Sequence, residues 1–268
     1  MEFTELQAER YSRHFILREI GVSGQRKLCE GRVLVIGAGG LGSAALAYLA
    51  SAGVGTIGIA DFDCVSLSNL QRQIIHGTAC LGEDKLLSAQ KFIKNLNPDV
   101  TVNLHYGMVS LDNITGLIAN YDFVLDCTDR FESKFLINDA CVLAKKPYSH
   151  AGVVRFEGQA MTYIPGKGPC LRCLLGGVPP RADCNTCSQV GVVGAAVGVI
   201  GSIQALEAIK FLVGSGELLC GRVLHFDGLN MKMKVTDFPH ADPDCAVCGD
   251  NARITSLDKN RAEYEQQN

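Results

Sequence analysis

Three glycines and an aspartate in the first quarter of the chain have the spacing of a nucleotide site. Gly37, Gly39 and Gly42 follow an apolar run, and Asp61 ends the next apolar run about twenty residues later. Glycines let the backbone approach phosphate oxygens, the following helix N-terminus offers N–H groups to them, and an acidic side chain accepts hydrogen bonds from ribose. The pattern predicts nucleotide binding but leaves NAD and ATP both open.

The residues that follow favour ATP. Asp63, Asn69, Arg72 and Gln73 lie in the stretch after the second apolar run, and Lys85 begins the next expected helix. Negative charge builds on a leaving pyrophosphate, and several cations and amides are needed to stabilise it. Any one of these cations alone would be a solvated surface charge; together they indicate a triphosphate.

The stretch LDCTDR at 125–130 ends another expected strand. Ligands of open parallel sheets bind beyond the carboxyl ends of the strands, so Asp126 and Asp129 are expected to face the same crevice as Gly37 and Asp61. Magnesium that accompanies ATP prefers one or two carboxylates plus phosphate oxygens, and Asp129 is the predicted ligand. The alternative role of Asp129 is the N-cap of a helix starting near Phe131.

Half of the twelve cysteines form Cys-x-x-Cys pairs. Two such pairs supply the four thiolates of a closed structural zinc site, whereas one pair alone suits redox chemistry. The N-terminus has no apolar leader, which favours a reducing compartment, where paired cysteines bind metal more often than they form disulfides. The pairs are Cys170/Cys173, Cys184/Cys187 and Cys245/Cys248.

The elements that must position these residues alternate between strand and helix in the first half. Such alternation predicts an α/β fold, with a Rossmann-like, mostly parallel sheet and helices on both faces. The expected strands are 32–36, 56–60, 100–104, 121–127 and 148–152, and the expected helices are 41–52, 84–95 and 131–145.

The pattern changes after residue 152. An alternating stretch at 154–165 predicts an antiparallel strand, and a loop rich in Gly, Pro and Cys follows at 166–189. A long helix of small residues and two more strands, at 222–229 and 231–238, complete the order. We expect one domain over 1–268, with a nucleotide-binding half at about 10–152 and a carrier-binding sheet, crossover loop and zinc-binding half at 153–250.

Composition excludes several classes of protein. The chain has 268 residues, 47% of them hydrophobic, and a net charge of -3 without a basic tail, so nucleic acid is not an expected partner. The uncharged run at 190–206 is shorter than the roughly 20 apolar residues of a membrane span and indicates a buried helix. These features predict a cytoplasmic protein with no membrane partner.

Taken together, the motifs resemble the ubiquitin-activating-like adenylyltransferases of thiamine and molybdopterin biosynthesis (the HesA/MoeB/ThiF family). The similarity runs from about residue 10 to residue 249. The family adenylates the C-terminal Gly-Gly carboxylate of a small ubiquitin-fold sulfur carrier protein, and the acyl-adenylate later receives sulfur as a thiocarboxylate. The matching segments, in family order, are RYSRHFILREIG, VIGAGGLGS, DFDCVSLSNLQRQI, DCTD, CLRC, VIGSIQALEAIK and CAVCG.

The resemblance implies roles for single residues. Arg13 falls on an arginine that family dimers donate to the partner subunit's site, which implies a homodimer. Arg130 departs from the family's usual Asn, and Lys134 stands where an arginine is common; the role of Arg130 stays open. The positions that fall on the family's ATP and Mg²⁺ residues are Gly40, Asp61, Asn69, Arg72, Lys85 and Asp129.

The resemblance also assigns the cysteines. Family zinc ligands match Cys170, Cys173, Cys245 and Cys248. Cys187 precedes the long helix, whose N-terminus would lower its pKa and activate it, and it matches a cysteine that takes part in sulfur transfer in some members and is dispensable in others. Cys184 either resolves a persulfide on Cys187 or has no role.

The leading hypothesis is therefore an ATP- and Mg²⁺-dependent sulfur carrier protein adenylyltransferase with structural zinc. A separate sulfur-donor protein is expected, because no such domain follows Cys248. One alternative is a non-catalytic, carrier-binding partner, which Arg130 supports. Another is an NAD(P)-dependent oxidoreductase with a redox cysteine pair. The sequence does not choose between thiamine, molybdopterin and tRNA thiolation pathways.

Overall fold

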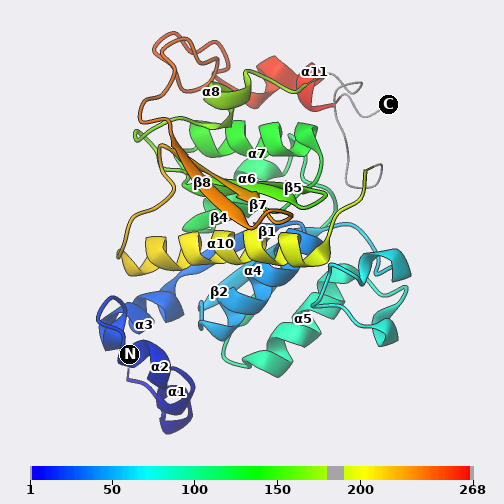
Figure 1. Cartoon of the computed structure of the whole chain (residues 1–268), viewed down its shortest axis with the longest axis vertical. Helices are drawn as coiled ribbons and strands as arrows, with labels where there is room; N and C mark the ends of the chain where they lie inside the picture. Colours follow the sequence, from blue (N-terminus) through cyan, green and yellow to red (C-terminus); the bar gives the residue numbers. More distant parts are fainter. Residues whose placement is uncertain (1, 180–189, 266–268) are drawn as a thin grey trace.

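One mixed sheet runs through the computed structural model of the chain, which describes residues 2–179 and 190–265. Its strand order is β3-β2-β1-β4-β5-β6-β7-β8 (Figure 1). The first five strands in that order are parallel, and those from β5 to β8 are antiparallel. The strands are β1 (Arg32–Ile36), β2 (Thr56–Asp61), β3 (Thr101–Tyr106), β4 (Phe123–Asp126), β5 (Tyr148–Val154), β6 (Glu157–Tyr163), β7 (Arg222–Asp227) and β8 (Lys232–Asp237).

The central strands are buried on both faces, because helices cover both sides of the parallel part of the sheet. One hydrophobic cluster joins the sheet to α3 (Gly21–Glu30), α4 (Gly40–Ser51), α5 (Lys85–Leu96) and α10 (Gly194–Val213). A second cluster joins the other face to α6 (Ile114–Ala119) and α7 (Phe131–Leu143). The α/β fold with a parallel core and added antiparallel strands is thus confirmed.

Shorter helices lie around this core. The chain begins with α1 (Glu5–Arg10) and α2 (Ser12–Phe15), close to α3, and ends with α11 (Arg261–Tyr264), which packs against α7 beside α8 (Leu171–Leu175) (Figure 1). Three short 3-10 helices complete the described elements: η1 (Leu67–Asn69), η2 (Thr78–Cys80) and η4 (Leu257–Asn260).

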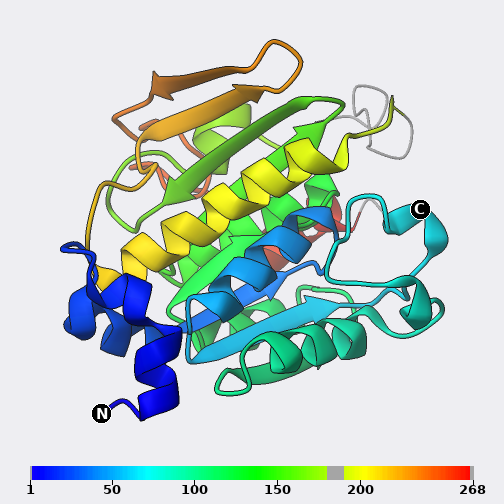
Figure 2. The same ribbon diagram turned by 60° about the horizontal axis from the view of Figure 1, so that its bottom comes forward.

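The long helix α10 is a core element. It is long and apolar enough to cross a membrane by composition, but half of its most apolar stretch is buried in the protein. Figure 2 shows α10 lying beside α4 across the same face of the sheet. A Cβ atom on Gly201 would lie 2.4 Å from the carbonyl oxygen of Leu41, so glycine is what lets the two helices approach closely.

The expected strand at 154–165 has a different boundary in the structure. Val154 ends β5, and β6 begins at Glu157. Arg155 between them has φ of 53°, in the left-handed region that reverses the chain. The residue alternation continues through this tight hairpin, which is why the sequence alone does not show the break.

Candidate functional site

A cavity of about 700 Å³ opens at the carboxyl ends of the parallel strands and continues along one face of β5 to β8. Ten residues that the sequence predicts for the nucleotide site line it. They are Gly37, Gly39, Gly40, Asp61, Asp63, Asn69, Arg72, Gln73, Lys85 and Asp129. The cavity therefore gathers these residues in one place, and their binding of a nucleotide stays a prediction.

Gly42 and Arg13, which the sequence also predicts for the site, do not line this cavity. Gly42 lies beneath the glycine turn, where a Cβ atom would be 1.9 Å from the carbonyl oxygen of Gly37, so its role is close packing. Arg13 lies on α2, away from the cavity of its own chain. Cys184 and Cys187 lie outside the described residues, so their predicted chemistry stays a prediction.

The glycine turn is shaped for an anion. Gly37 has φ of 100°, and a Cβ atom there would lie 2.7 Å from the carbonyl oxygen of Cys127. The following helix α4 begins at Gly40, and its N-cap, Gly39, has no side chain to satisfy the first N–H groups. These groups and the helix dipole favour phosphate oxygens at this end of the cavity.

Asp61 holds that turn in place. One carboxylate oxygen accepts a hydrogen bond from the Ala38 N–H at 2.7 Å, and the other accepts from the N–H groups of Phe62 and Asp63 at 2.7 and 2.9 Å. Two carboxylate oxygens offer about four acceptor positions, so about one remains for a ribose hydroxyl. Asp61 thus supports the turn as well as offering an acceptor to a ligand.

Two cations and a buried side-chain amide whose oxygen accepts no hydrogen bond follow β2 in the chain and line the cavity. The Lys85 ammonium is buried and donates to Asp63 at 2.9 Å, and Arg72 donates to the carbonyl oxygen of Ser68 at 3.1 Å. The side-chain oxygen of Gln73 is buried and has no hydrogen-bond partner within the described part of the chain. A buried polar atom without a partner costs free energy, so this oxygen fits a site that a ligand completes.

Asp129 is exposed and lines the same cavity. Helix α7 has Arg130 as its N-cap and no side-chain capping bond, so Asp129 does not serve as the cap that was its alternative role. Within the described part of the chain, its carboxylate makes no hydrogen bond or ion pair. Its exposed oxygens fit the carboxylate chemistry that Mg²⁺ prefers.

The expectation that Asp126 faces the crevice is wrong. Asp126 is fully buried at the end of β4 and does not line the cavity. It accepts hydrogen bonds from the His150 ring at 2.8 Å, the Lys134 ammonium at 3.2 Å and the Thr128 hydroxyl at 2.7 Å. The pairing of β4 with β5 sets His150 beside Asp126 and so creates this cluster. A single sequence does not show that strand register.

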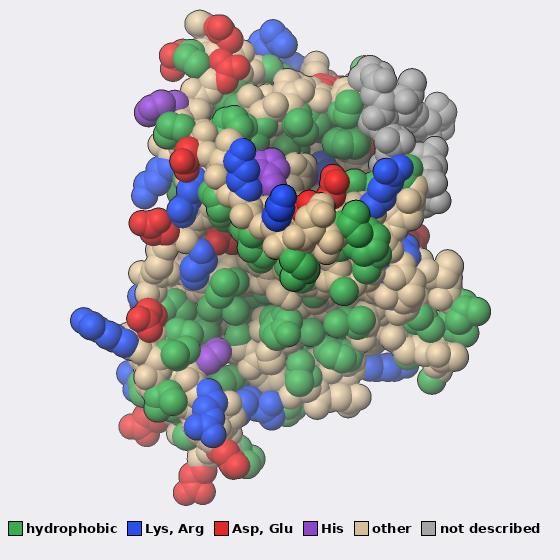
Figure 3. Space-filling view, viewed as in Figure 1, with side chains coloured by type: hydrophobic (Ala, Val, Ile, Leu, Met, Phe, Trp, Pro, Cys, Tyr) green, Lys and Arg blue, Asp and Glu red, His purple; other side chains and the backbone are tan. Residues whose placement is uncertain are grey.

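The far end of the cavity is a strip of polar side chains that the sequence analysis did not predict as part of the site. In one row, Gln159, His225 and Lys234 are direct neighbours on β6, β7 and β8. In the next row, Glu157, Asp227 and Lys232 are neighbours in the same way. All six line the cavity. Figure 3 shows charged and histidine side chains gathered over β7 and β8, with apolar side chains below them over α10.

We call these six residues the polar strip. The sequence contains a pattern that could have predicted them. His225 and Asp227 alternate with apolar residues in one strand, and Lys232 and Lys234 do so in the next. Alternation of that kind marks a strand with one open face. What the sequence did not reveal is that the open face continues into the nucleotide site.

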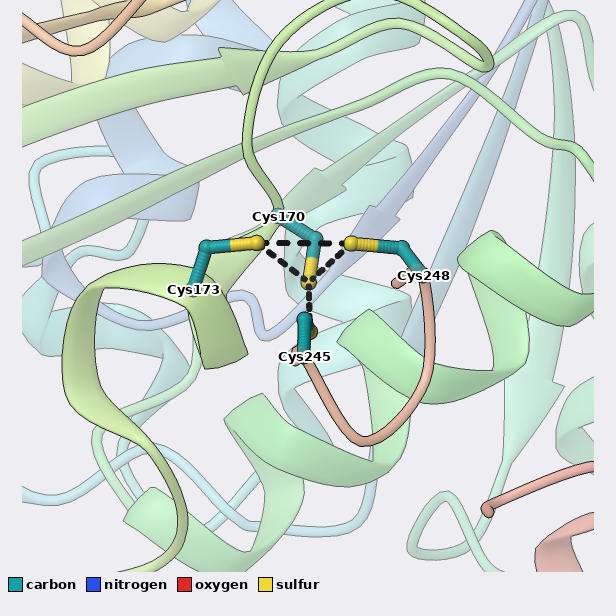
Figure 4. Close-up of side chains that lie close together, drawn as sticks. All are labelled: Cys170, Cys173, Cys245 and Cys248. Carbon is teal, nitrogen blue, oxygen red and sulfur yellow. Dashed lines mark hydrogen bonds between the residues drawn. The ribbon is translucent and has the colours of Figure 1, made fainter. Parts of the chain in front are cut away.

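A second centre lies behind the sheet, where four cysteines converge (Figure 4). Cys170 and Cys173 come from the start of α8, and Cys245 and Cys248 come from the C-terminal loop. The Sγ atom of Cys170 lies 3.9, 3.6 and 3.4 Å from those of Cys173, Cys245 and Cys248, and the Sγ atoms of Cys173 and Cys248 are 3.3 Å apart. Tetrahedral zinc with Zn–S bonds of about 2.3 Å requires separations of about 3.8 Å, so these thiols fit that metal.

A buried arginine links this centre to the C-terminal helix. Arg172, between two of the cysteines, donates to Asp139 on α7 and to Glu263 on α11 at 2.8 to 3.1 Å. Burial would lower the pKa of Arg172, but these two carboxylates raise it above its usual value. The arginine therefore stays charged and ties α8 to α7 and α11.

Comparisons with known proteins agree with this geometry. The family model described as the ThiF family matches residues 11–247. The "Adenylyltransferase and sulfurtransferase MOCS3-2" of Zea mays is 44% identical over 256 residues, covering 96% of this chain and 53% of the maize protein. The "SAMP-activating enzyme E1" of Haloferax volcanii is 43% identical over 244 residues, covering 91% of this chain and 90% of the archaeal protein.

Among solved structures, that of E. coli MccB has a TM-score of 0.79. It is 23% identical in sequence and covers 90% of this chain and 74% of its own, so the likeness concerns the fold. The chain spans about half the length of the maize relative but nearly all of the archaeal one.

Proposed function

The chain belongs to the ThiF family, and we propose on that basis that it uses ATP and Mg²⁺ to adenylate the C-terminal carboxylate of a small ubiquitin-fold sulfur carrier protein. The observation that carries the proposal is the shape of the cavity. One end has the glycine turn and cations that suit a triphosphate, and the other continues along an open sheet face that suits a polypeptide. An enzyme that transfers AMP from ATP to a protein terminus needs both.

The residues at the nucleotide end have separable roles in this reaction. The N-terminus of α4 would bind the phosphates, while Arg72 and Lys85 would stabilise the charge on the leaving pyrophosphate. Asp129 would hold Mg²⁺, which neutralises phosphate charge when bound. The carboxylate of the carrier is itself the nucleophile, so no protein base is required. Catalysis then consists of positioning and charge stabilisation.

We assign the polar strip and the end of β5 to the carrier. A C-terminal tail lying along this face would reach the nucleotide end past Gly152 and Val153, which line the cavity between the two parts. Main-chain groups and charged side chains of the strip would then fix the tail in one register.

We also propose that the four-cysteine cluster holds structural zinc. The cluster has four thiol ligands and so no open position for a reactant, which is the pattern of structural rather than catalytic zinc. Zinc would clamp the start of α8 to the C-terminal loop. Arg172 extends that clamp to α11 through its ion pair with Glu263.

A homodimer is the assembly that fits the surface. Apolar side chains are exposed on the segment after α2, on α3, on α10 and on β8. Met233 lies in the same row of the sheet as Gly158, where a Cβ atom would contact Ile200 of α10, so Met233 is on the α10 face. Exposed apolar residues that continue over neighbouring elements mark interaction surfaces. The exposed residues are Ile16, Leu17, Val22, Leu206, Met233 and Val235. In such a dimer, Arg13 would reach the cavity of the partner subunit.

Sulfur transfer is a later step for which Cys187 is the proposed residue. A separate donor protein would supply the sulfur. The proposal rests on the position of Cys187 before α10 in the sequence.

Of the alternatives, only the non-catalytic partner has a supporting observation, namely Arg130 among the residues that line the cavity. Two findings remove the support for the oxidoreductase hypothesis. The chain belongs to the ThiF family, and two of its cysteine pairs form one four-cysteine cluster rather than separate redox pairs.

ATP–pyrophosphate exchange with Mg²⁺ tests the proposal. Candidate carriers ending in Gly-Gly are compared with versions that lack the last glycine. We expect exchange that requires one intact carrier. Zinc-replete protein that binds ATP but supports no exchange with any carrier would instead favour the non-catalytic partner.

A further inference from the structure

Lys134 is a buried cation in the wall of the cavity. Its side chain, on the first turn of α7, is 7% exposed. The ammonium donates to Asp126 at 3.2 Å and to the carbonyl oxygen of Ala151 at 2.7 Å. An ammonium carries three N–H groups, so these two acceptors leave one donor. Because Lys134 lines the cavity, that donor is available to a ligand there.

The partner of this cation is already saturated. Asp126 also accepts from His150 and from the hydroxyl and N–H of Thr128. Burial would raise the pKa of Asp126, but Lys134, His150 and Thr128 together hold it below its usual value. The carboxylate is therefore ionised at neutral pH and keeps the ammonium in a fixed position. Burial and the Lys134 charge lower the pKa of His150, so the ring is a neutral donor.

Lys134 lines the cavity between β4 and β5, since it is bonded to Asp126 on one strand and Ala151 on the other. Asp129 and Thr128 line the wall on one side of it, and Gly152 and Val153 line the strand β5 that leads to the polar strip. The phosphate-side cations Arg72 and Lys85 belong instead to the segments after β2. Lys134 is thus bonded to β5, the strand that leads to the polar strip, and not to the segments that carry Arg72 and Lys85.

Building on the proposed function, we propose that Lys134 binds the C-terminal carboxylate of the carrier through its third N–H. One carboxylate oxygen accepts this hydrogen bond while the other attacks the α-phosphorus of ATP. The new C–O–P link forms as the bond to pyrophosphate breaks, and no proton moves. Asp126 and His150 act as positioning residues, since they reach the substrate only through Lys134.

The competing explanation is that Lys134 only neutralises buried Asp126. The double variant Asp126→Asn/Lys134→Met separates the two, because it removes the buried charge together with its partner. Lys134→Met and Lys134→Arg complete the set. Lys146→Met is the matched control, because Lys146 is a half-buried lysine that donates to a carbonyl oxygen and does not line the cavity.

The measurements are the carrier KM in pyrophosphate exchange and the ATP Kd by calorimetry without carrier. We expect Lys134→Met and the double variant to raise the carrier KM about tenfold or more, as for loss of one charge-assisted hydrogen bond. The ATP Kd should not change, and Lys134→Arg should recover part of the loss. Lys146→Met should match the wild type.

Two results would overturn the inference. Wild-type carrier KM in the double variant would mean that Lys134 only balances Asp126. An ATP Kd raised as much as the carrier KM would place Lys134 at the phosphates. If the wild type supports no exchange, the proposed function fails by itself, and calorimetry of intact carrier binding to the wild type and the double variant then decides the role of Lys134.

Discussion

The Nζ atom of Lys85 lies 2.9 Å from the Oδ2 atom of Asp63, yet the lysine side chain is 5% exposed and the aspartate 51%. The rigid member of the pair is the cation, which α5 fixes in the wall of the cavity. The aspartate is at the surface, where an ion pair contributes little to stability. In the proposed reaction, phosphate would therefore replace Asp63 at small cost, and the pair would keep Lys85 oriented until it does.

This relationship predicts that Lys85→Met lowers the exchange rate by about a hundredfold or more, because one charge that stabilises the transition state is lost. The urea midpoint should change little. Lys91→Met is the control, since Lys91 lies on the same helix in an exposed pair with Glu83. Exchange by Lys85→Met at the rate of the control would remove Lys85 from the mechanism.

Asp129→Ala is expected to abolish exchange, and circular dichroism should show an intact fold because Asp129 is exposed and caps no helix. The Mg²⁺ concentration needed for any residual rate should rise. Asp112→Ala, at another exposed aspartate, provides the comparison. Normal exchange with normal Mg²⁺ dependence in Asp129→Ala would show that the metal is held elsewhere.

Arg13 can be tested by mixing two inactive variants. If Arg13 acts in the partner subunit, a dimer of one Arg13→Ala chain and one Asp129→Ala chain has one complete site. Random reassortment should then restore about a quarter of the wild-type activity, since half of the dimers are mixed and each has one working site. Activity that stays absent after verified subunit exchange would mean that both residues serve the same chain's site.

The four-cysteine cluster predicts one zinc ion per chain. Cys245→Ser should reduce zinc content and lower the melting temperature, because metal-binding free energy contributes to folding. Cys220→Ser, at a half-buried cysteine outside the cluster, should do neither. Elemental analysis and thermal melts check both. Protein that is purified without zinc and melts as before in the presence of a chelator would contradict the zinc assignment.

Buried His150 predicts a pH dependence of stability. Burial, together with the charge of Lys134 on α7, lowers its pKa from 6.5 in the folded state, although Asp126 on β4 opposes the shift. As pH falls below about 6.5, the unfolded chain binds a proton that the folded chain does not, so the free energy of unfolding declines until the folded pKa is reached.

His150→Gln should therefore show a shallower decline between pH 7 and pH 5 than the wild type. Urea unfolding at several pH values measures the two slopes. Parallel slopes would show that another group causes the acid sensitivity.

Local spacing was enough to predict which residues gather around the glycine turn at one end of the cavity. Gly37 and Gly39 belong to one turn, and Asp61 ends the adjacent strand, so their relation depends on one strand–turn–helix–strand unit. Asp129 was also placed correctly on the cavity, as the residue that follows a strand end. By contrast, Asp126 was misplaced, because its neighbours Lys134 and His150 come from α7 and β5. The sequence also did not reveal that the polar strip shares the nucleotide cavity.

The sequence by itself thus determined what depends on neighbours along the chain: the glycine turn, its acidic partner, the order of strands and helices, and the Cys-x-x-Cys pairs. Tertiary structure alone decided which distant segments meet. It brought Cys170 beside Cys245, set His150 opposite Asp126, and aligned β6, β7 and β8 so that their polar faces extend the nucleotide site. The physical reason is that strand register and helix packing are set by burial of the whole core, and a shift of one residue would reverse every face.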